Sequence, residues 1–228
     1  MLPRVARPQA PSAPRPSLAQ PKTRFRGRRL ERPDSPRRGP WIALAYGGLG
    51  ALGATLAEAC GQSPWTTDAW AGTSGWSSFL SSLAFGGLIA VVTVRTTRVL
   101  GRARWARTLH ADLRPVAHGL DDGAILLMAI ASGLGEELFF RGWLTPYVGV
   151  LASAVAFGAV HQVRGRARWA WAAWAAVMGL AFGFIYRLTG NLAGPIVAHV
   201  TVNALNLRYL RDHDPEAKPK LLGGLLSR

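Results

Sequence analysis

Six apolar stretches make up most of the chain beyond residue 40, and their lengths constrain the fold more than any other feature. These stretches are Trp41–Ala59, Phe79–Val94, Gly123–Leu144, Pro146–His161, Trp169–Leu188 and Ile196–Leu210. An α-helix rises about 1.5 Å per residue, so the first stretch covers roughly 28 Å, enough for the hydrocarbon core of a bilayer. The pattern therefore predicts an all-α protein, a polytopic bundle of about six transmembrane helices.

Charged residues are scarce and unevenly placed, unlike those of an ordinary soluble domain. They make up 17% of the chain, against about a quarter in soluble domains. Residues 1–40 hold eleven Lys or Arg and nine Pro, with too little apolar surface to offset the entropy of ordering. We therefore expect a disordered basic tail at 1–40, a transmembrane hairpin with a basic segment at 41–120, a core at 121–210 and a polar tail at 211–228.

The net charge of +15 invites a nucleic-acid interpretation, but the distribution of basic residues favours a membrane. Arginines cluster in the tail, between the second and third apolar stretches, and between the fourth and fifth. Cytoplasmic loops of membrane proteins carry such an excess, which predicts that both termini are cytoplasmic. No zinc-finger, RNP or KH pattern is present, so we expect the lipid bilayer and not nucleic acid as a partner. Cys60 is the only cysteine, which excludes an intramolecular disulfide.

The third apolar stretch contains Glu136, Glu137 and Arg141, charges that are costly in a bilayer and that indicate a functional site. Glu137 and Arg141 are four residues apart and can pair along one helical face. Glu136 points about 100° away from Glu137, which leaves its carboxylate available as a general base. The alternative is a purely structural interhelical salt bridge.

Two further polar pairs occur in later stretches at the same four-residue spacing. Phe157 and His161 share one helical face, so the phenylalanine can form the wall of a pocket that the histidine enters. His199 and Asn203 share a face of the last apolar helix, where polar side chains normally point into the bundle. The topology leaves one conflict, because it puts Glu136 and His199 towards the outer half and His161 near the inner end. We expect the fourth helix to be tilted or displaced, or its ends to differ from this assignment.

Glu136, His161, His199 and Asn203 together form a plausible hydrolytic centre. Two histidines and a carboxylate are a common ligand set of catalytic zinc, so Glu136, His161 and His199 are candidate ligands of a divalent metal. Alternatively, Glu136 activates water directly while the histidines and Asn203 stabilise the oxyanion. The sequence leaves both open and contains no HExxH motif.

The ordered motifs Glu136-Glu137-x3-Arg141, Phe157-x3-His161 and His199-x3-Asn203 resemble those of the CPBP family of intramembrane proteases. This family includes the type II CAAX prenyl endopeptidases and bacterial bacteriocin-processing and self-immunity proteins. The resemblance covers about residues 121–210. It implies a catalytic core with an active-site cavity inside the membrane, and an integral protein of the bacterial inner membrane.

The resemblance also implies roles for individual residues. Glu136 is the water-activating base and Glu137 its neighbour, His161, His199 and Asn203 complete the site, and Arg141 and Phe157 support it. The expected substrate is a membrane protein or peptide cleaved near its C-terminus, with zinc as the first candidate if a metal is bound. Two alternatives stay open: a non-catalytic immunity or scaffold protein of the same family, and an ion-coupled carrier. The sequence does not indicate an oligomeric state.

Overall fold

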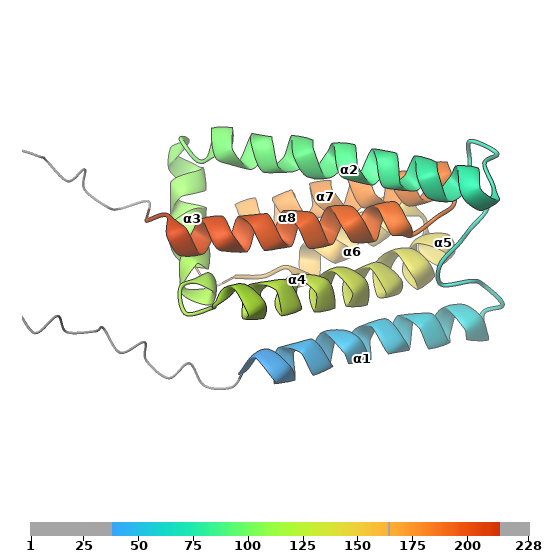
Figure 1. The fold of residues 1–228 in the computed structure, drawn as a ribbon, viewed down its shortest axis with the longest axis horizontal. Helices are drawn as coiled ribbons and strands as arrows, with labels where there is room; N and C mark the ends of the chain where they lie inside the picture. The colour runs from blue at the N-terminus through green and yellow to red at the C-terminus, as the bar shows by residue number, and fades with distance from the viewer. Residues whose placement is uncertain (1–37, 164, 215–228) are drawn as a thin grey trace, which may run out of the picture. The chain divides into compact units, whose positions relative to one another are not determined.

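The computed structural model describes residues 38–163 and 165–214, and these ranges are mostly helical (Figure 1). The elements are α1 (Arg38–Ala59), α2 (Gly75–Leu100), α3 (Arg104–Ala117), α4 (Asp122–Glu137), the π-helix η1 (Leu138–Leu144), α5 (Thr145–Val148), α6 (Val150–Val160), α7 (Arg168–Thr189) and α8 (Ala193–Asp212). The described residues contain no β-strand, only an isolated bridge between Thr66 and Asn191. The prediction of an all-α helical bundle is confirmed.

Some predicted segments fall outside the described residues. The basic tail expected at 1–40 lies there except for its last three residues, and so does the C-terminal tail from residue 215 onward. The domain boundaries proposed from the sequence stay predictions.

Four helical stretches are long and apolar enough to cross a membrane: Trp41–Ala59, Gly75–Leu100, Asp122–Val148 and Arg168–Thr189. The six predicted apolar stretches are mostly helical, although Gly149 interrupts the fourth, and the fourth and sixth do not meet this standard. The fourth, α6, has only eleven residues. The sixth, α8, has twenty residues but carries several polar side chains along its length. Lengths and compositions of the four long helices fit a polytopic membrane protein.

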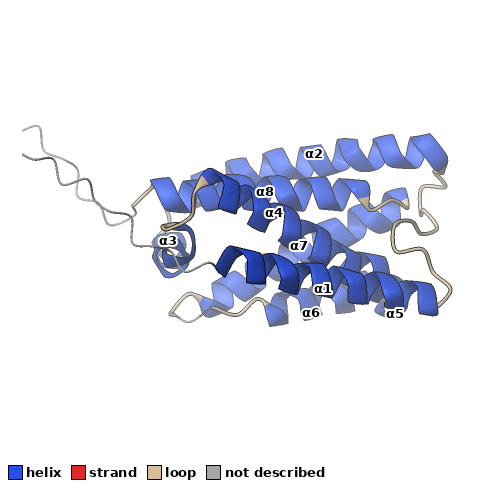
Figure 2. Cartoon of the chain, turned by 60° about the horizontal axis from the view of Figure 1, so that its bottom comes forward, coloured by secondary structure: helices blue, strands red, loops and turns tan. Residues whose placement is uncertain are grey.

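The helices surround α4 and α8, which carry most of the polar motif residues. Helix α4 packs against α1 on one side and against α8 on another, while α2 packs against α8 and α6 against α7. Figures 1 and 2 show these helices running roughly along one direction. Helix α3 crosses them at the end where α1 and α4 begin (Figure 1).

Helix α3 was not predicted, because the sequence indicated only a basic cytoplasmic segment there. Its apolar residues recur at helical spacing, and Trp105, Leu109 and Leu113 line the interior cavity described below. Arg104 and Arg107 are exposed. An apolar face opposite a basic face is typical of a helix that lies at a membrane surface.

Local hydrogen bonds mark the starts of α2 and α4. At the start of α2, the Ser74 backbone N–H donates a hydrogen bond to the Ser77 hydroxyl at 3.4 Å, which is one half of a capping box. The Asp121 carboxylate accepts a hydrogen bond from the Ala124 N–H at 2.8 Å and caps α4.

The connection from α4 to α6 resolves the conflict in depth between Glu136 and His161. After α4, the chain continues through η1 and α5 and then reverses at Gly149, whose φ of +85° suits a residue without a Cβ atom. Helix α6 therefore begins at Val150, four residues later than predicted. Its eleven residues rise only about 16 Å. The helix ends part-way back along the bundle, where His161 lies beside Glu136.

Candidate active site

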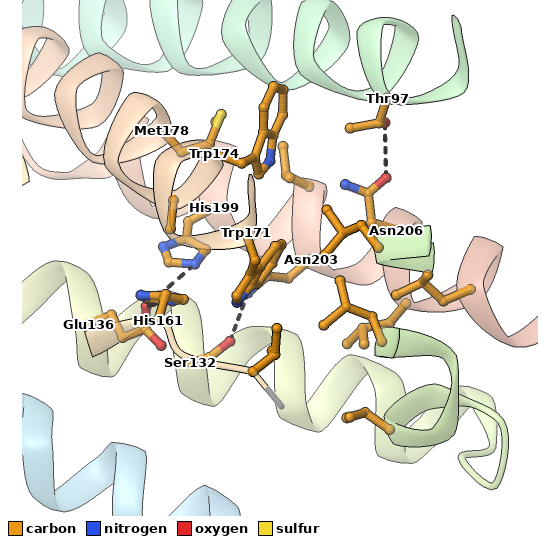
Figure 3. A pocket seen from close by; sticks show the side chains of 18 of the residues that line it. Thr97, Ser132, Glu136, His161, Trp171, Trp174, Met178, His199, Asn203 and Asn206 are labelled. Atoms are coloured by element: carbon orange, nitrogen blue, oxygen red, sulfur yellow. Dashed lines mark hydrogen bonds and ion pairs between the residues drawn. The ribbon is translucent and has the colours of Figure 1, made fainter. Parts of the chain in front are cut away.

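Glu136, His161 and His199 come together from three different helical segments, as Figure 3 shows. The Oε2 atom of Glu136, on α4, lies 3.5 Å from Nε2 of His161 at the end of α6. It also lies 3.8 Å from Nε2 of His199 on α8. Glu136 and His199 are each only 5% exposed. The three residues thus form one buried cluster, as the sequence motifs led us to expect.

The hydrogen bond made by Nδ1 of each histidine determines whether its Nε2 atom donates or accepts a hydrogen bond. Nδ1 of His161 lies 2.7 Å from the backbone carbonyl of Phe157, which can only accept a hydrogen bond. Nδ1 of His199 lies 2.7 Å from Oε1 of Glu137. Both Nδ1 atoms therefore donate, and in neutral rings both Nε2 atoms are acceptors.

Three acceptor atoms consequently face one another around Glu136. Oε2 of Glu136 has no hydrogen-bond partner among the described residues, although it is fully buried. Unpartnered buried acceptors are costly. A group that supplies hydrogens or positive charge, such as a water molecule, a protonated imidazole or a cation, would complete the cluster.

Glu137 anchors a second set of contacts behind this cluster. Its Oε1 atom accepts a hydrogen bond from Nη1 of Arg141 at 3.1 Å and one from Nδ1 of His199 at 2.7 Å. Glu137 is fully buried and Arg141 is 1% exposed. The ion pair expected from the four-residue spacing is confirmed, and it orients His199.

Arg141 lies in η1, where the wider π-helical turn follows directly after the acidic pair. Its Nη2 atom donates to the backbone carbonyl of Gly179 on α7 at 3.2 Å. Its guanidinium carbon lies 4.4 Å from the ring centroid of Phe157. Single π-helical turns are common at functional sites, and here the turn directs a buried cation into the bundle.

Phe157 forms one wall of the site, as predicted. Its ring centroid lies 4.3 Å from that of His161 and 6.0 Å from that of His199. The side chain is 2% exposed. Phe157 therefore separates the histidines from Arg141 with an apolar surface and limits the rotamers of all three side chains.

Asn203 lies in the same pocket, but in the described part of the chain no hydrogen bond joins it to Glu136, His161 or His199. Its Nδ2 atom donates to the Ser132 hydroxyl at 3.0 Å. Asn206, one turn further along α8, accepts hydrogen bonds from Thr97 at 3.2 Å and from Arg98 at 3.1 Å. Figure 3 shows both asparagines pointing into the same pocket as Glu136 and the histidines.

The site opens into a cavity of about 570 Å³. Glu136, His161 and His199 line one part of it, and its wall continues past Asn203 and Asn206 to the apolar face of α3. A cavity of this size is in the range of ligand pockets. Most of its lining is aromatic or aliphatic, including the side chains of Phe140, Trp171, Trp174, Met178 and Phe182.

Comparison with known families assigns this part of the chain. Residues 123–205, which contain all three motifs, match the family described as type II CAAX prenyl endopeptidase Rce1-like. This segment is Rce1-like. The match confirms the family expected from the motifs, and because the Rce1-like family is a peptidase family it supports peptidase chemistry in general.

A curated relative aligns over a similar length. The protein YpbD of Bacillus subtilis (strain 168), itself described as uncharacterized, is 28% identical over 81 residues, which are 36% of this chain. The chain spans 42% of the length of that relative. No solved structure matches the chain. The Rce1-like segment and the four long apolar helices together indicate an integral membrane protein.

Ser132, Tyr46 and Arg98 are among the cavity residues that the sequence did not mark as site residues. Ser132 lies one turn before Glu136 on the same face of α4, so helical spacing offered a signal for it. Tyr46 and Arg98 lie outside the Rce1-like segment, on α1 and α2. Their approach to the site depends on how these helices pack, and no local pattern encodes it.

The residues fit a metal only in part. Two imidazole nitrogens and a carboxylate are suitable zinc ligands, and the hydrogen bonds of both Nδ1 atoms are those of metal-binding histidines. However, no group of three or more His, Cys, Asp or Glu side chains in the described ranges is arranged as a metal site. The mechanism below therefore uses no metal.

Proposed function

We propose that this protein is an intramembrane endopeptidase that hydrolyses a peptide bond near the C-terminus of a membrane-associated protein or peptide. One observation carries the proposal: Oε2 of Glu136, which has no hydrogen-bond partner among the described residues, faces Nε2 of two histidines beside a large apolar cavity. The Rce1-like segment supports the same class of reaction.

Glu136 acts as the general base in this proposal. A water molecule between its carboxylate and the two Nε2 atoms gives a proton to Oε2, and the oxygen attacks the carbonyl carbon of the peptide bond. Positioned bases of this kind contribute typically 10²–10⁴-fold to the rate. Burial among apolar side chains keeps competing water away from the carboxylate.

His199 and Asn203 stabilise the negative oxygen of the tetrahedral intermediate. Glu137 accepts the Nδ1 hydrogen of His199 and orients the ring, so that a His199 that enters the reaction protonated at both nitrogens donates from Nε2 to that oxygen. Asn203 has two N–H groups, one of which binds Ser132 and so orients the amide. Arg141 stabilises the charge of Glu137 and takes no direct part in the reaction.

His161 assists the second half of the reaction. When the carbon–nitrogen bond breaks, the leaving amine must receive a proton, which Glu136 holds after attack. The 3.5 Å separation of Oε2 and Nε2 of His161 allows that proton to pass to the amine directly or through the histidine. His161 is more exposed to the cavity than His199, with 20% of its side chain accessible.

Arg98 supports cleavage near a C-terminus. It is the one Lys or Arg among the described residues that line the cavity, and it forms no ion pair with a described acidic side chain. Arg98 belongs to α2, and its guanidinium donates to Asn206 and to the Leu205 carbonyl, which hold the side chain against α8. A guanidinium in this position is suited to bind the α-carboxylate of a peptide.

The spacing along α8 gives the expected distance from that carboxylate to the cleaved bond. His199 and Asn206 are seven residues apart on one helix, which corresponds to roughly 10 Å. An extended peptide covers about 3.3 Å per residue. A bond held at Glu136 would therefore lie about three residues from a carboxylate bound by Arg98.

We place the protein in the bacterial inner membrane with both termini cytoplasmic. The basic residues of α3 and the start of α7 support this orientation, because positively charged segments stay inside. The exposed Trp65, Trp70 and Trp76 follow or precede spans at the other end, as interfacial aromatics do. The same distribution favours lipid and a membrane-bound substrate over nucleic acid.

A bound divalent metal, with zinc as the first candidate, is a separate proposal. If present, it would bind Glu136, His161 and His199, lower the pKa of a bound water and polarise the peptide carbonyl. Elemental analysis of purified wild type against a His161→Ala, His199→Ala double variant tests it. A stoichiometric metal that the double variant lacks would support it, and equal trace content in both would contradict it.

The proposed reaction can be tested with purified full-length protein in liposomes and a library of membrane-anchored peptides with free C-termini. We expect wild type to release short C-terminal fragments, Glu136→Gln to release none, and Glu58→Gln, which changes an exposed carboxylate outside the cavity, to match wild type. Equal cleavage by wild type and Glu136→Gln would contradict the proposal.

A further inference from the structure

Tyr46 brings a polar group from α1 to the candidate base. Its hydroxyl lies near the Glu136 carboxylate, with which it interacts electrostatically, and both side chains line the same cavity. Tyr46 lies 77 residues before the start of the segment 123–205 that matches the Rce1-like family. The family match therefore says nothing about this residue.

The backbone around Tyr46 is held at short range to the residue that precedes Glu136. A Cβ atom on Gly135 would overlap the backbone carbonyl of Tyr46, so only glycine permits this approach. One turn along α1, a Cβ atom on Gly50 would come within 3.0 Å of the Gly135 Cα atom. Tyr46, Gly50 and Gly53 lie on one face of α1, which packs along α4 and η1. Main-chain packing thus fixes the position from which the Tyr46 side chain extends towards the cavity.

The groups that surround Glu136 leave a specific need for such a donor. Glu137 has its own cation in Arg141 and its own hydrogen-bond donor in His199. Apart from Tyr46, the Oε2 atom of Glu136 faces the Nε2 atoms of the two histidines, whose role as donor or acceptor changes as protons move. A phenol, which ordinarily titrates near pH 10, keeps its hydrogen throughout the reaction.

We infer that Tyr46 is a positioning residue for Glu136, and that α1 is part of the active site although it lies outside the Rce1-like segment. This inference rests on the proposed peptidase function. The hydroxyl of Tyr46 holds the carboxylate so that Oε2 stays directed at the histidines and at the attacking water. Loss of the hydroxyl should impair the chemical step and leave substrate binding intact.

The test compares Tyr46→Phe with wild type on a peptide that wild type cleaves. Phenylalanine keeps the ring and its packing and removes only the hydroxyl. We expect kcat to fall roughly 10- to 100-fold, the effect of one hydrogen bond to a charged group, with KM within about twofold. Tyr147→Phe, at an exposed tyrosine outside the cavity, is the matched control and should equal wild type.

Two further measurements separate the possible outcomes. Rates are expressed per folded molecule, from the amplitude of thermal unfolding, so a decrease that vanishes on this scale would overturn the inference. Glu136→Gln is measured in the same assay. If Glu136→Gln is inactive while Tyr46→Phe equals wild type, the inference falls and the proposed function stands. If Glu136→Gln is active, the proposed function itself falls.

Discussion

Oε1 of Glu137 lies 2.7 Å from Nδ1 of His199 and 3.1 Å from Nη1 of Arg141, so one buried carboxylate connects α4, η1 and α8. It balances the charge of a buried arginine and determines which nitrogen of His199 faces Glu136. The adjacent carboxylate of Glu136 has no arginine partner in the described residues, and its Oε2 atom faces the Nε2 atoms of His161 and His199. Two neighbouring glutamates are therefore in different environments, which suits one for support and the other for chemistry.

Replacement of Glu137 by alanine should destabilise the fold strongly. Arg141 would stay buried without its counterion, a change that typically costs 3–5 kcal/mol. Thermal or denaturant unfolding in detergent measures it. Asp122→Ala, which removes the exposed partner of Arg211, is the control and should change stability much less. Equal stability of the two variants would contradict this assignment of Glu137.

Replacement of His161 by alanine should reduce turnover while the protein stays folded. If His161 passes a proton to the leaving amine, the loss should be roughly 100-fold or more in kcat. His118→Ala, at an exposed histidine outside the cavity, should behave as wild type. A His161→Ala enzyme with unchanged kcat would exclude His161 from the chemical step.

Replacement of Arg98 by glutamine should weaken substrate binding. Loss of a charged hydrogen bond to the substrate carboxylate should raise KM roughly tenfold or more. Arg95→Gln, at an exposed position of the same helix, is the matched control. A substrate with an amidated C-terminus should bind wild type and Arg98→Gln equally. If Arg98→Gln still prefers the free carboxylate as strongly as wild type, Arg98 is not its binding group.

Replacement of Gly135 by alanine should separate α1 from α4. The added Cβ atom meets the Tyr46 backbone, which cannot move as a flexible side chain would, and overpacking of this kind typically costs 1–3 kcal/mol. Gly47→Ala meets nothing within 4 Å and should be neutral or slightly stabilising because alanine favours helix. Unfolding midpoints of the two variants give the comparison, and no difference between them would contradict the close packing.

The helices and the main polar motifs could be predicted because their signals are local. The lengths of the apolar stretches were enough to predict the six helical segments. The four-residue spacing of Glu137 and Arg141 predicted their ion pair, because such a pair needs only one turn of helix. Phe157 and His161 could be paired for the same reason. The roles of Glu136, His161, His199 and Asn203 in catalysis stay predictions, although the first three lie together.

The features that the sequence did not reveal depend on non-local geometry. Helix α3 was not predicted because arginines dominate the composition of its segment. Its apolar face becomes evident only in the folded bundle, where it lines the cavity. The depth of His161 depends on the reversal at Gly149, which shortens α6. Tyr46 could not be predicted as a site residue, because the sequence of an apolar helix does not indicate which of its faces packs against another helix.

The most direct test of the central claim is made in the native host, by mass spectrometry of C-terminal peptides from membranes that contain either wild type or Glu136→Gln. The account predicts that a defined group of membrane proteins or peptides keeps extra C-terminal residues in the Glu136→Gln strain and is processed again when wild type is restored. Identical C-termini in the two strains, with both proteins present in the membrane at equal levels, would contradict it.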